Sequence, residues 1–355
     1  MSGWRDRRLA ERLGLSTPIV QAPMAGAGGV DLAIGAATGG ALASLPAALI
    51  APEAIIQQIS TFRAATGAAV NLNFFCHQLE PAEDAAWRDA LAPFYAAYGV
   101  GYPAVPPPAR APFGPRQAEA VEQVFPEVVS FHFGLPDDTL LARVKATGAL
   151  IVGNATTPAE ARWLAARGVD AIIAQGHEAG GHAGRFLGAD PAEHMGTIAL
   201  VPQVADATGL PVIAAGGIGD ERGVAAALVL GAALVQLGTA YLFCPESLIA
   251  QGHRDLLAGE AAEHSRVTNL FTGGIARRLP SPLFDNFGAV SPLAPAFPHA
   301  AAALAELRKA AEAAGDGRFS PWWSGEAARL GQALPAEALT RRLADGALAL
   351  LGDAR

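Results

Sequence analysis

Two histidines and a glutamate lie in a glycine-rich stretch that directly follows a short apolar run. The run starts at Ala171, contains β-branched residues and is typical of a buried strand. The chain then continues as Gly176-His177-Glu178-Ala179-Gly180-Gly181-His182-Ala183-Gly184. Glycines allow backbone N–H groups to approach a ligand that a side chain would obstruct, and here two imidazoles and a carboxylate stand beside them. The stretch therefore predicts a loop that can transfer protons beside a bound cofactor.

These residues do not form the helical zinc motif His-Glu-x-x-His. In that motif the two histidines are four positions apart on one face of a helix. His177 and His182 are five positions apart, and Gly180 and Gly181 lie between them. Neither the spacing nor the conformation suits a zinc-binding helix, so we predict no metal ligands here.

The segments that must hold this loop alternate between strand-like and helix-like patterns along most of the chain. Strands are expected at Ile19–Met24, Ala41–Leu45, Ala68–Phe74, Val128–Phe133, Ala149–Asn154, from Ala171, at Val212–Ala215 and at Ala233–Leu237. Helices are expected at Val30–Thr38, Pro52–Arg63, Gln117–Val124, Asp137–Thr147, Pro158–Arg167, Thr197–Ala207 and Glu221–Leu230. About eight such units close a TIM (β/α)8 barrel, and near-continuous apolar strands suit a parallel sheet covered on both faces. A doubly wound open sheet is the alternative, but glycines and polar residues gather after the strands, where barrel active sites lie.

Two segments interrupt this alternation. An irregular excursion, about residues 76–115, follows the third strand, and connections of that length are usually lids or peripheral insertions. Beyond Pro245 the alternation stops, and Ala296–Ala314 and Pro335–Leu351 have helical periodicity. We therefore expect residues 1–255 to form the barrel and residues 256–355 to form a helical cap packed on it.

The composition excludes several classes of protein. The chain has 355 residues, of which 51% are hydrophobic and 16% charged, but it contains no apolar run of about 18 residues that would span a membrane. A net charge of −8 gives no basic surface for nucleic acid. Cys76 and Cys244 cannot form a disulfide framework, and the charged N-terminus leads into no apolar signal region. We expect a cytoplasmic protein that acts on a small molecule.

Four motifs follow predicted strands and offer polar groups or bare backbone. They are Gln21-Ala22-Pro23-Met24-Ala25-Gly26, Asn71-Leu72-Asn73, Ala215-Gly216-Gly217-Ile218-Gly219-Asp220 and Gln236-Leu237-Gly238-Thr239. In barrels, the loops after strands seven and eight often bind phosphate through backbone amides, so the last two motifs predict a phosphate site. The alternative is that these glycines serve only tight turns. An asparagine at a strand end can contact the edge of a heterocycle, or it can simply cap a turn.

In this order, the four motifs and the Gln175–His182 stretch resemble the nitronate monooxygenases, also called 2-nitropropane dioxygenases, which are FMN-dependent TIM-barrel enzymes. The resemblance covers roughly Ile19 to Ser247. The versions most typical of this family are Asn71-Leu72-Asn73-Phe74-Phe75 and Gly238-Thr239-Ala240-Tyr241-Leu242-Phe243-Cys244-Pro245-Glu246-Ser247.

The resemblance implies a non-covalently bound FMN and a catalytic histidine, His182. Its phosphate would contact Gly217, Gly238 and Thr239, and its ring system would lie near Asn71, Gln175 and Gly180, with Met24, Gly181 and Gln236 as further contacts. The implied reaction is oxidation of alkyl nitronates by O2 to a carbonyl compound and nitrite. Whether neutral nitroalkanes also react is open.

Two other functions stay open at this point. The Glu178–His182 element also resembles FMN-dependent enoyl-acyl-carrier-protein reductases and related NADH:quinone reductases, so an NADH-using reductase of an enoyl thioester or quinone is the main alternative. A non-catalytic flavin- or phosphate-binding barrel is the third. We expect His177 to support the loop and His182 to carry the chemistry, because His177 lies nearer the strand.

Overall fold

The computed structural model describes residues 4–81, 83–102, 110–188 and 190–352 of the chain. Eight parallel strands surround the centre of the larger part in the order β1-β9-β8-β6-β5-β4-β3-β2. Their bounds are β1 (Ile19–Gln21), β2 (Ala43–Pro46), β3 (Val70–Phe75), β4 (Val128–His132), β5 (Leu150–Ala155), β6 (Ala171–Gln175), β8 (Val212–Ala215) and β9 (Leu234–Leu237). A parallel bridge from Val20 to Leu42, beside β2, joins the two ends of this order. The closed ring confirms the predicted TIM barrel and excludes the open sheet.

Helices cover the outside of the ring in the positions that the periodicity predicts. They are α2 (Val30–Thr38), α3 (Pro52–Ala65), α5 (Pro115–Val124), α6 (Asp138–Ala146), α7 (Pro158–Ala166), α8 (Thr197–Thr208) and α9 (Glu221–Val229). Several begin at a side-chain cap, because Asp137, Thr157 and Asp220 each accept a hydrogen bond from a backbone N–H of the first turn. The apolar faces of strands and helices form one continuous core.

Residues 256–355, expected to form a helical cap, divide into two parts with different positions. Their last helix, α14 (Ala336–Leu350), packs against α2 and α9 on the outside of the ring. Its approach is close, since a β-carbon at Gly39 would lie 2.6 Å from the β-carbon of Thr340. Thr340 is also hydrogen-bonded to Tyr241 at 2.6 Å. This C-terminal helix therefore completes the outer layer of the barrel beside β9 and β1.

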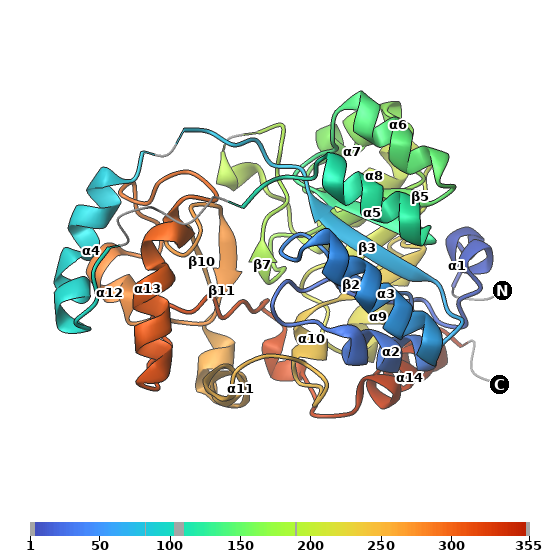
Figure 1. Ribbon diagram of the computed structural model, residues 1–355. Helices are drawn as coiled ribbons and strands as arrows, with labels where there is room; N and C mark the ends of the chain where they lie inside the picture. Colours follow the sequence, from blue (N-terminus) through green and yellow to red (C-terminus); the bar gives the residue numbers. More distant parts are fainter. Residues whose placement is uncertain (1–3, 82, 103–109, 189, 353–355) are drawn as a thin grey trace.

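The rest of that segment combines with the excursion to form a second, smaller body, which we call the lobe. It contains α4 (Ala85–Ala97), α12 (Leu283–Phe287) and α13 (Ala300–Ala313), seen at the left of Figure 1. Its own apolar core includes Trp87, Leu304 and Phe319. The excursion is thus less irregular than the sequence predicts, because a 13-residue helix forms around Pro93 despite the missing N–H. Residues 82 and 103–109 of the expected excursion lie outside the described residues.

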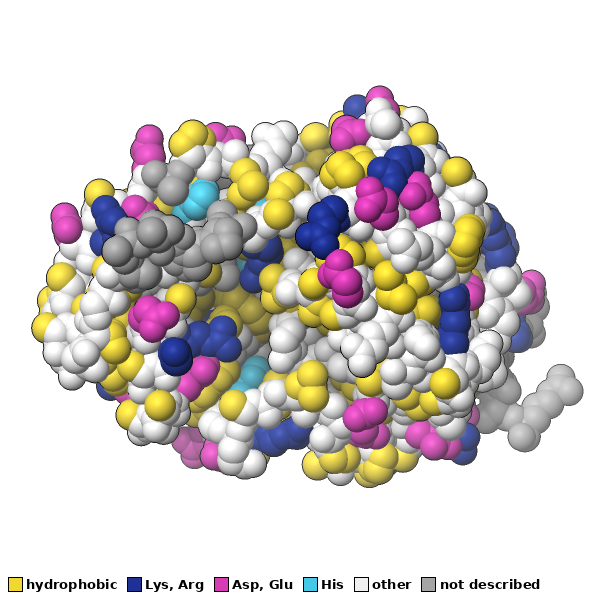
Figure 2. All heavy atoms as spheres, in the orientation of Figure 1, with side chains coloured by type: hydrophobic (Ala, Val, Ile, Leu, Met, Phe, Trp, Pro, Cys, Tyr) yellow, Lys and Arg dark blue, Asp and Glu magenta, His cyan; other side chains and the backbone are white. Residues whose placement is uncertain are grey.

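A three-stranded sheet connects the lobe to the barrel. It consists of β10 (Arg266–Thr268), β11 (Ala276–Arg278) and β7 (Gly181–His182), with β11 in the middle. Because β7 belongs to the loop after β6, the lobe lies over the carboxyl ends of the barrel strands. Figure 2 shows the surface hollowed between the barrel and the lobe.

The remaining elements are short. They are the helices α1 (Arg8–Leu13), α10 (Thr239–Leu242) and α11 (Gln251–Ala258) and the 3-10 turns Pro191–Glu193, Glu260–Glu263 and Ala328–Leu330. Among the described helices, none combines the length and apolar character needed to cross a membrane.

Candidate active site

His182 lies in a box of aromatic rings where the lobe meets the barrel. The centre of its ring is 5.1 Å from that of Phe297 and 5.1 Å from that of Trp323, while Phe133 and Phe75 follow at 6.0 and 6.3 Å. All four rings meet it at steep angles, which brings ring edges against ring faces. We call these four side chains the aromatic box.

Two features define the chemistry of the His182 imidazole. Its Nε2 is 2.8 Å from Oγ1 of Thr272, so one ring nitrogen is engaged by a hydroxyl. Burial, followed by the positive charge of Arg110 and the nearby His132 and His77, holds the pKa of His182 well below its ordinary value. The ring is therefore neutral at physiological pH and can give or accept a hydrogen bond without carrying charge.

The backbone of His182 is fixed by two side chains of the barrel. Nε2 of Gln175 donates to the His182 carbonyl at 2.9 Å, and Nε2 of His132 donates to the same oxygen at 3.2 Å. The other end of the Gln175 amide accepts from Nδ2 of Asn154 at 3.1 Å and from the Gly184 N–H at 2.8 Å. Both ends of the Gln175 amide thus have partners in the protein, and these contacts orient the loop from Gly176 to Ala183.

The glycines of the loop lie against the backbone around Gly325. A β-carbon at Gly180 would lie 2.5 Å from the backbone nitrogen of Gly325, and Gly181 has a φ of +76°, which disfavours a side chain. The Glu326 N–H donates to the Glu178 carbonyl at 3.0 Å, which holds the segment around Gly325 against the loop. Glycine is required here because two backbones pass each other.

The predicted phosphate loops are neighbours, because β8 and β9 pair directly. Gly216 and Gly217 have φ values of +106° and +69°, and Gly238 caps the short helix α10. Within the part of the chain that the structure describes, the N–H groups of Gly217, Gly238 and Thr239 donate to no other group. We call these three N–H groups the amide cradle; Oγ1 of Thr239 accepts from the Gly325 N–H at 2.9 Å, so Gly325 adjoins both cradle and loop.

Asn71 lies on the other side of the ring, on β3. Its Nδ2 donates to Oγ of Ser44 at 3.0 Å, and the backbone N–H of Ser44 donates to Oε1 of Gln21 at 3.0 Å. The Oδ1 atom of Asn71 is buried and has no hydrogen-bond donor among the described residues. A buried acceptor without a partner is costly, so this atom is suited to receive a donor from a ligand.

The other predicted contacts lie at the barrel end of this arrangement. Sδ of Met24 is 3.7 Å from the position that a β-carbon of Gly238 would occupy. Gln236 is partly exposed on β9, in register with Ala215 of β8. The structure therefore groups Met24, Gly217, Gln236, Gly238 and Thr239 around the cradle, and Gln175, Gly180 and Gly181 around His182.

Several residues around His182 are missing from the sequence-based prediction. Thr272, Phe297 and Trp323 come from the lobe, about 90 to 140 positions along the chain, and the sequence did not predict that they adjoin His182. Arg110, from the end of the excursion, lies with its guanidinium carbon 5.5 Å from the centre of the Phe75 ring. Phe75 belongs to a motif that the sequence analysis identified, because it ends the stretch Asn71-Leu72-Asn73-Phe74-Phe75.

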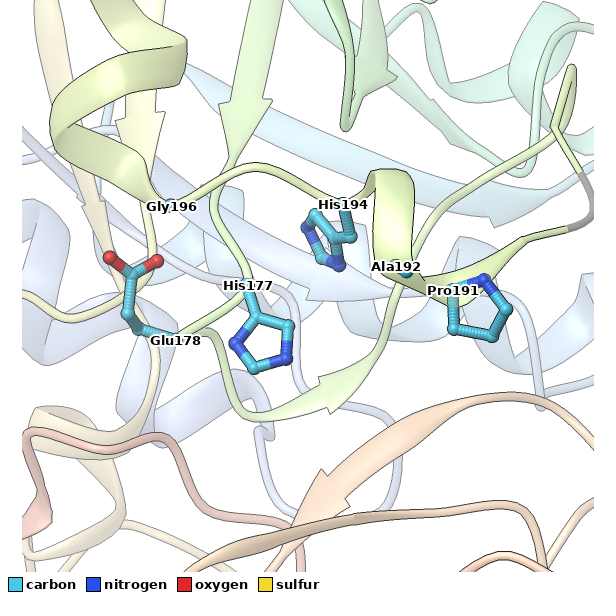
Figure 3. Close-up of a pocket in the computed structure, with 6 residues that line it drawn as sticks. All are labelled: His177, Glu178, Pro191, Ala192, His194 and Gly196. Atoms are coloured by element: carbon cyan, nitrogen blue, oxygen red, sulfur yellow. The ribbon is translucent and has the colours of Figure 1, made fainter.

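A surface depression lies on the opposite side of the loop and is lined by polar groups. Figure 3 shows His177, Glu178, Pro191, Ala192, His194 and Gly196 around it. Nε2 of His194 donates to the Gln175 carbonyl at 2.8 Å, and both carboxylate oxygens of Glu178 accept from the Thr197 N–H at 3.0 Å. Nδ1 of His177 is 3.0 Å from Nη2 of Arg277. These contacts hold the loop in place.

Comparisons with known proteins show the family to which the chain belongs. The family model described as nitronate monooxygenase matches residues 7–346. A nitronate monooxygenase of Paraburkholderia phytofirmans is 40% identical over 95% of this chain and 94% of its own length. The solved structure of nitroalkane oxidase from Streptomyces ansochromogenes superimposes with a TM-score of 0.87 at 36% identity, covering 97% of this chain and 98% of that one. FabK from Thermotoga maritima, at 23% identity and a TM-score of 0.72 over 98% and 97% of the two chains, shares the fold. The chain belongs to the nitronate monooxygenase family of enzymes.

Proposed function

We propose that this enzyme uses FMN to oxidise alkyl nitronates with O2, giving a carbonyl compound and nitrite. The observation that carries the proposal is a histidine held in an aromatic box over the carboxyl ends of the barrel strands, in a chain of this family. Family membership supports oxidation of nitro compounds. The nitronate, the products and the identity of the flavin are the parts that we propose.

The residues present fit an FMN molecule. The N–H groups of Gly217, Gly238 and Thr239, which find no acceptor in the described parts of the chain, suit the oxygens of a phosphate. The unpartnered Oδ1 of Asn71 suits an N–H group at the edge of a heterocyclic ring. When bound, the flavin supplies the electron transfer that no amino-acid side chain here can supply.

The pKa of His182 bears on which form of the substrate the site serves. A general base works best when its pKa lies near the operating pH, and the pKa of His182 is held well below that range. A neutral nitroalkane must lose a proton to such a base, whereas a nitronate arrives without it. The nitronate is therefore the better substrate on physical grounds. A bound anion would also favour protonated His182 and raise its pKa.

The test is anaerobic mixing of the purified enzyme with a nitronate and, separately, with NADH. We expect the nitronate to bleach the flavin absorbance and NADH to leave it unchanged. Bleaching by NADH alone would support the reductase of an enoyl thioester or quinone instead. Bleaching by neither compound would support a non-catalytic flavin-binding barrel.

A further inference from the structure

Arg110 is a partly buried cation for which the described residues offer no oppositely charged partner. Its guanidinium carbon lies 5.5 Å from the centre of the Phe75 ring and 5.6 Å from that of Phe297. Within the described residues, the guanidinium forms no hydrogen bond and no ion pair. The residues just before it, 103–109, are Pro-Ala-Val-Pro-Pro-Pro-Ala and contain no acidic side chain. Among the described residues, the guanidinium is therefore held by two ring faces.

The surroundings of Arg110 are those of the catalytic histidine. Phe75 and Phe297 belong to the aromatic box, so the same two rings contact both Arg110 and His182. Among the described residues, the charged or titratable groups that face His182 are Arg110, His77 and His132, and His299 faces His77. None of these groups is a carboxylate. Arg110 thus gives the box a positive potential that no acidic side chain of the described residues balances.

Burial of an unbalanced cation is unfavourable, and its effect is visible in Arg110. Desolvation lowers the pKa of this guanidinium to about 10, with no opposing attraction from an anionic group. Contact with aromatic faces offsets only part of such a cost. Arg277, in contrast, is also buried but lies 2.9 Å from the carboxylate of Glu326. Arg110 keeps its charge at neutral pH, so its guanidinium is available to bind an anionic ligand.

We propose that Arg110 binds the negatively charged oxygens of the substrate and thereby selects the nitronate anion over the neutral nitroalkane. The inference rests on the proposed function, which supplies an anionic substrate. A nitronate carries two oxygens on one planar nitrogen, and the planar fork of a guanidinium can donate to both. His182, neutral and in contact with the same two rings, supplies a hydrogen bond but no charge.

The experiment compares Arg110→Met, which keeps the apolar stem against the rings, with Arg110→Lys, which keeps the charge. Arg88→Met is the matched control, because Arg88 also lies over a ring, Tyr102 at 4.8 Å, but in the lobe beside Asp84. Flavin content and melting temperature are measured first to show that each variant is folded. The readouts are kcat/KM for a nitronate and its neutral nitroalkane, and calorimetric binding of nitrate, a planar anion that does not react.

We expect Arg110→Met to lower kcat/KM for the nitronate by about 10- to 100-fold, mostly through KM, as loss of a charged hydrogen bond predicts. Turnover of the nitroalkane should change less than about 3-fold, nitrate affinity should fall with the nitronate, and Arg110→Lys should recover part of both. Equal losses on the two substrates would assign Arg110 a structural role and overturn the proposal.

The nitrate measurement separates this inference from the proposed function. If the wild-type enzyme consumes no nitronate, the proposed function fails, yet weaker nitrate binding by Arg110→Met would still support an anion site. If the wild type and Arg110→Met bind nitrate equally, or if the wild type binds none, the inference is wrong whatever the enzyme oxidises.

Discussion

The two sides of the loop from Gly176 to Ala183 carry similar residue types and differ in how those residues are partnered. On the outer side, His177, His194 and Glu178 are each bound to a backbone or side-chain group of the protein. On the inner side, the guanidinium of Arg110 has no acceptor among the described residues, and neither Oδ1 of Asn71 nor the amide cradle has a partner there. A cluster of titratable groups is therefore a weaker sign of a binding site than groups whose hydrogen-bonding capacity is left unused.

The broadest effect should follow from filling the amide cradle, because turnover of either substrate form needs the cofactor. Gly238→Asp places a carboxylate beside N–H groups that we assign to a phosphate, so FMN content should fall below about a tenth of the wild-type value and activity with it. Gly238→Ala is the matched control, because Gly238 has a φ of −105° and its β-carbon would meet only Ala22 and Met24, at 3.6 and 3.7 Å.

Flavin absorbance per protein and chromatography of the released cofactor measure this effect. Gly217→Asp should act in the same way, but its φ of +69° and a 3.1 Å contact with Glu178 add strain, so it is the less clean variant. Full flavin content in Gly238→Asp would mean that the phosphate lies elsewhere. Release of FAD would contradict the single-phosphate site.

A large effect on one substrate form, with FMN retained, should come from His182→Asn. If His182 accepts the α-proton of a nitroalkane, kcat/KM for the neutral form should fall by about 10²- to 10⁴-fold, the usual contribution of a general base. Turnover of the nitronate should fall much less, because asparagine can still donate a hydrogen bond to the nitro group. Both values are measured at unchanged FMN content. Equal losses would mean that His182 binds or positions the substrate.

Much of the barrel could be predicted from the sequence because its signals are local. The expected bounds of α2 and β8 agree with the structure, and those of α14 differ by a single residue at each end. The position of α14 was not predictable, since an amphipathic pattern shows that a helix buries one face but not against which partner. Its partner surface depends on close approach at Gly39, some 300 positions earlier in the chain.

The site divides in the same way between local and distant signals. The Gln175–His182 motif and the glycine loops are continuous in sequence, and each could be found without the fold. The aromatic box around His182 could not be found in this way, because it forms when the two residues of β7 pair with β11. A two-residue strand is too short to leave a pattern in the sequence. Arg110 depends on the same assembly, since only its proximity to Phe297 gives it a role.

Thr272 offers a test of moderate size on the inner side. Thr272→Val keeps the volume of a buried side chain and removes the hydroxyl that lies 2.8 Å from Nε2 of His182. Loss of one neutral hydrogen bond should lower kcat/KM by about 3- to 10-fold. Thr272→Ser should restore the rate, which separates the hydroxyl from the methyl group. No change in Thr272→Val would show that the His182 ring is oriented by the aromatic box alone.

Acid should destabilise the inner side through His132. Burial lowers the pKa of His132 to about 4, whereas an unfolded chain has the ordinary value near 6.5. The unfolded state therefore binds more protons between these values, and the free energy of unfolding falls as the pH falls from about 6.5 to about 4. His132→Gln keeps a donor for the His182 carbonyl and should reduce this loss of stability by about 2 kcal/mol, because His132 is only half-buried. Urea unfolding at several pH values measures it, and parallel curves would contradict the assignment.

The smallest effect is expected on the outer side, from His177→Asn. The substitution removes an acceptor of Arg277, but that guanidinium keeps the carboxylate of Glu326 at 2.9 Å and the backbone carbonyl of residue 177 at 3.2 Å. The free energy of unfolding should therefore fall by only about 1 kcal/mol, and kcat/KM for both substrate forms should stay within about 3-fold of the wild type. The measurement uses the same two substrates as for His182→Asn, so the two imidazoles are compared directly. A loss on the neutral nitroalkane as large as that of His182→Asn would transfer the proton acceptor to the outer side, and unused hydrogen-bonding capacity would then no longer distinguish the catalytic side of the loop.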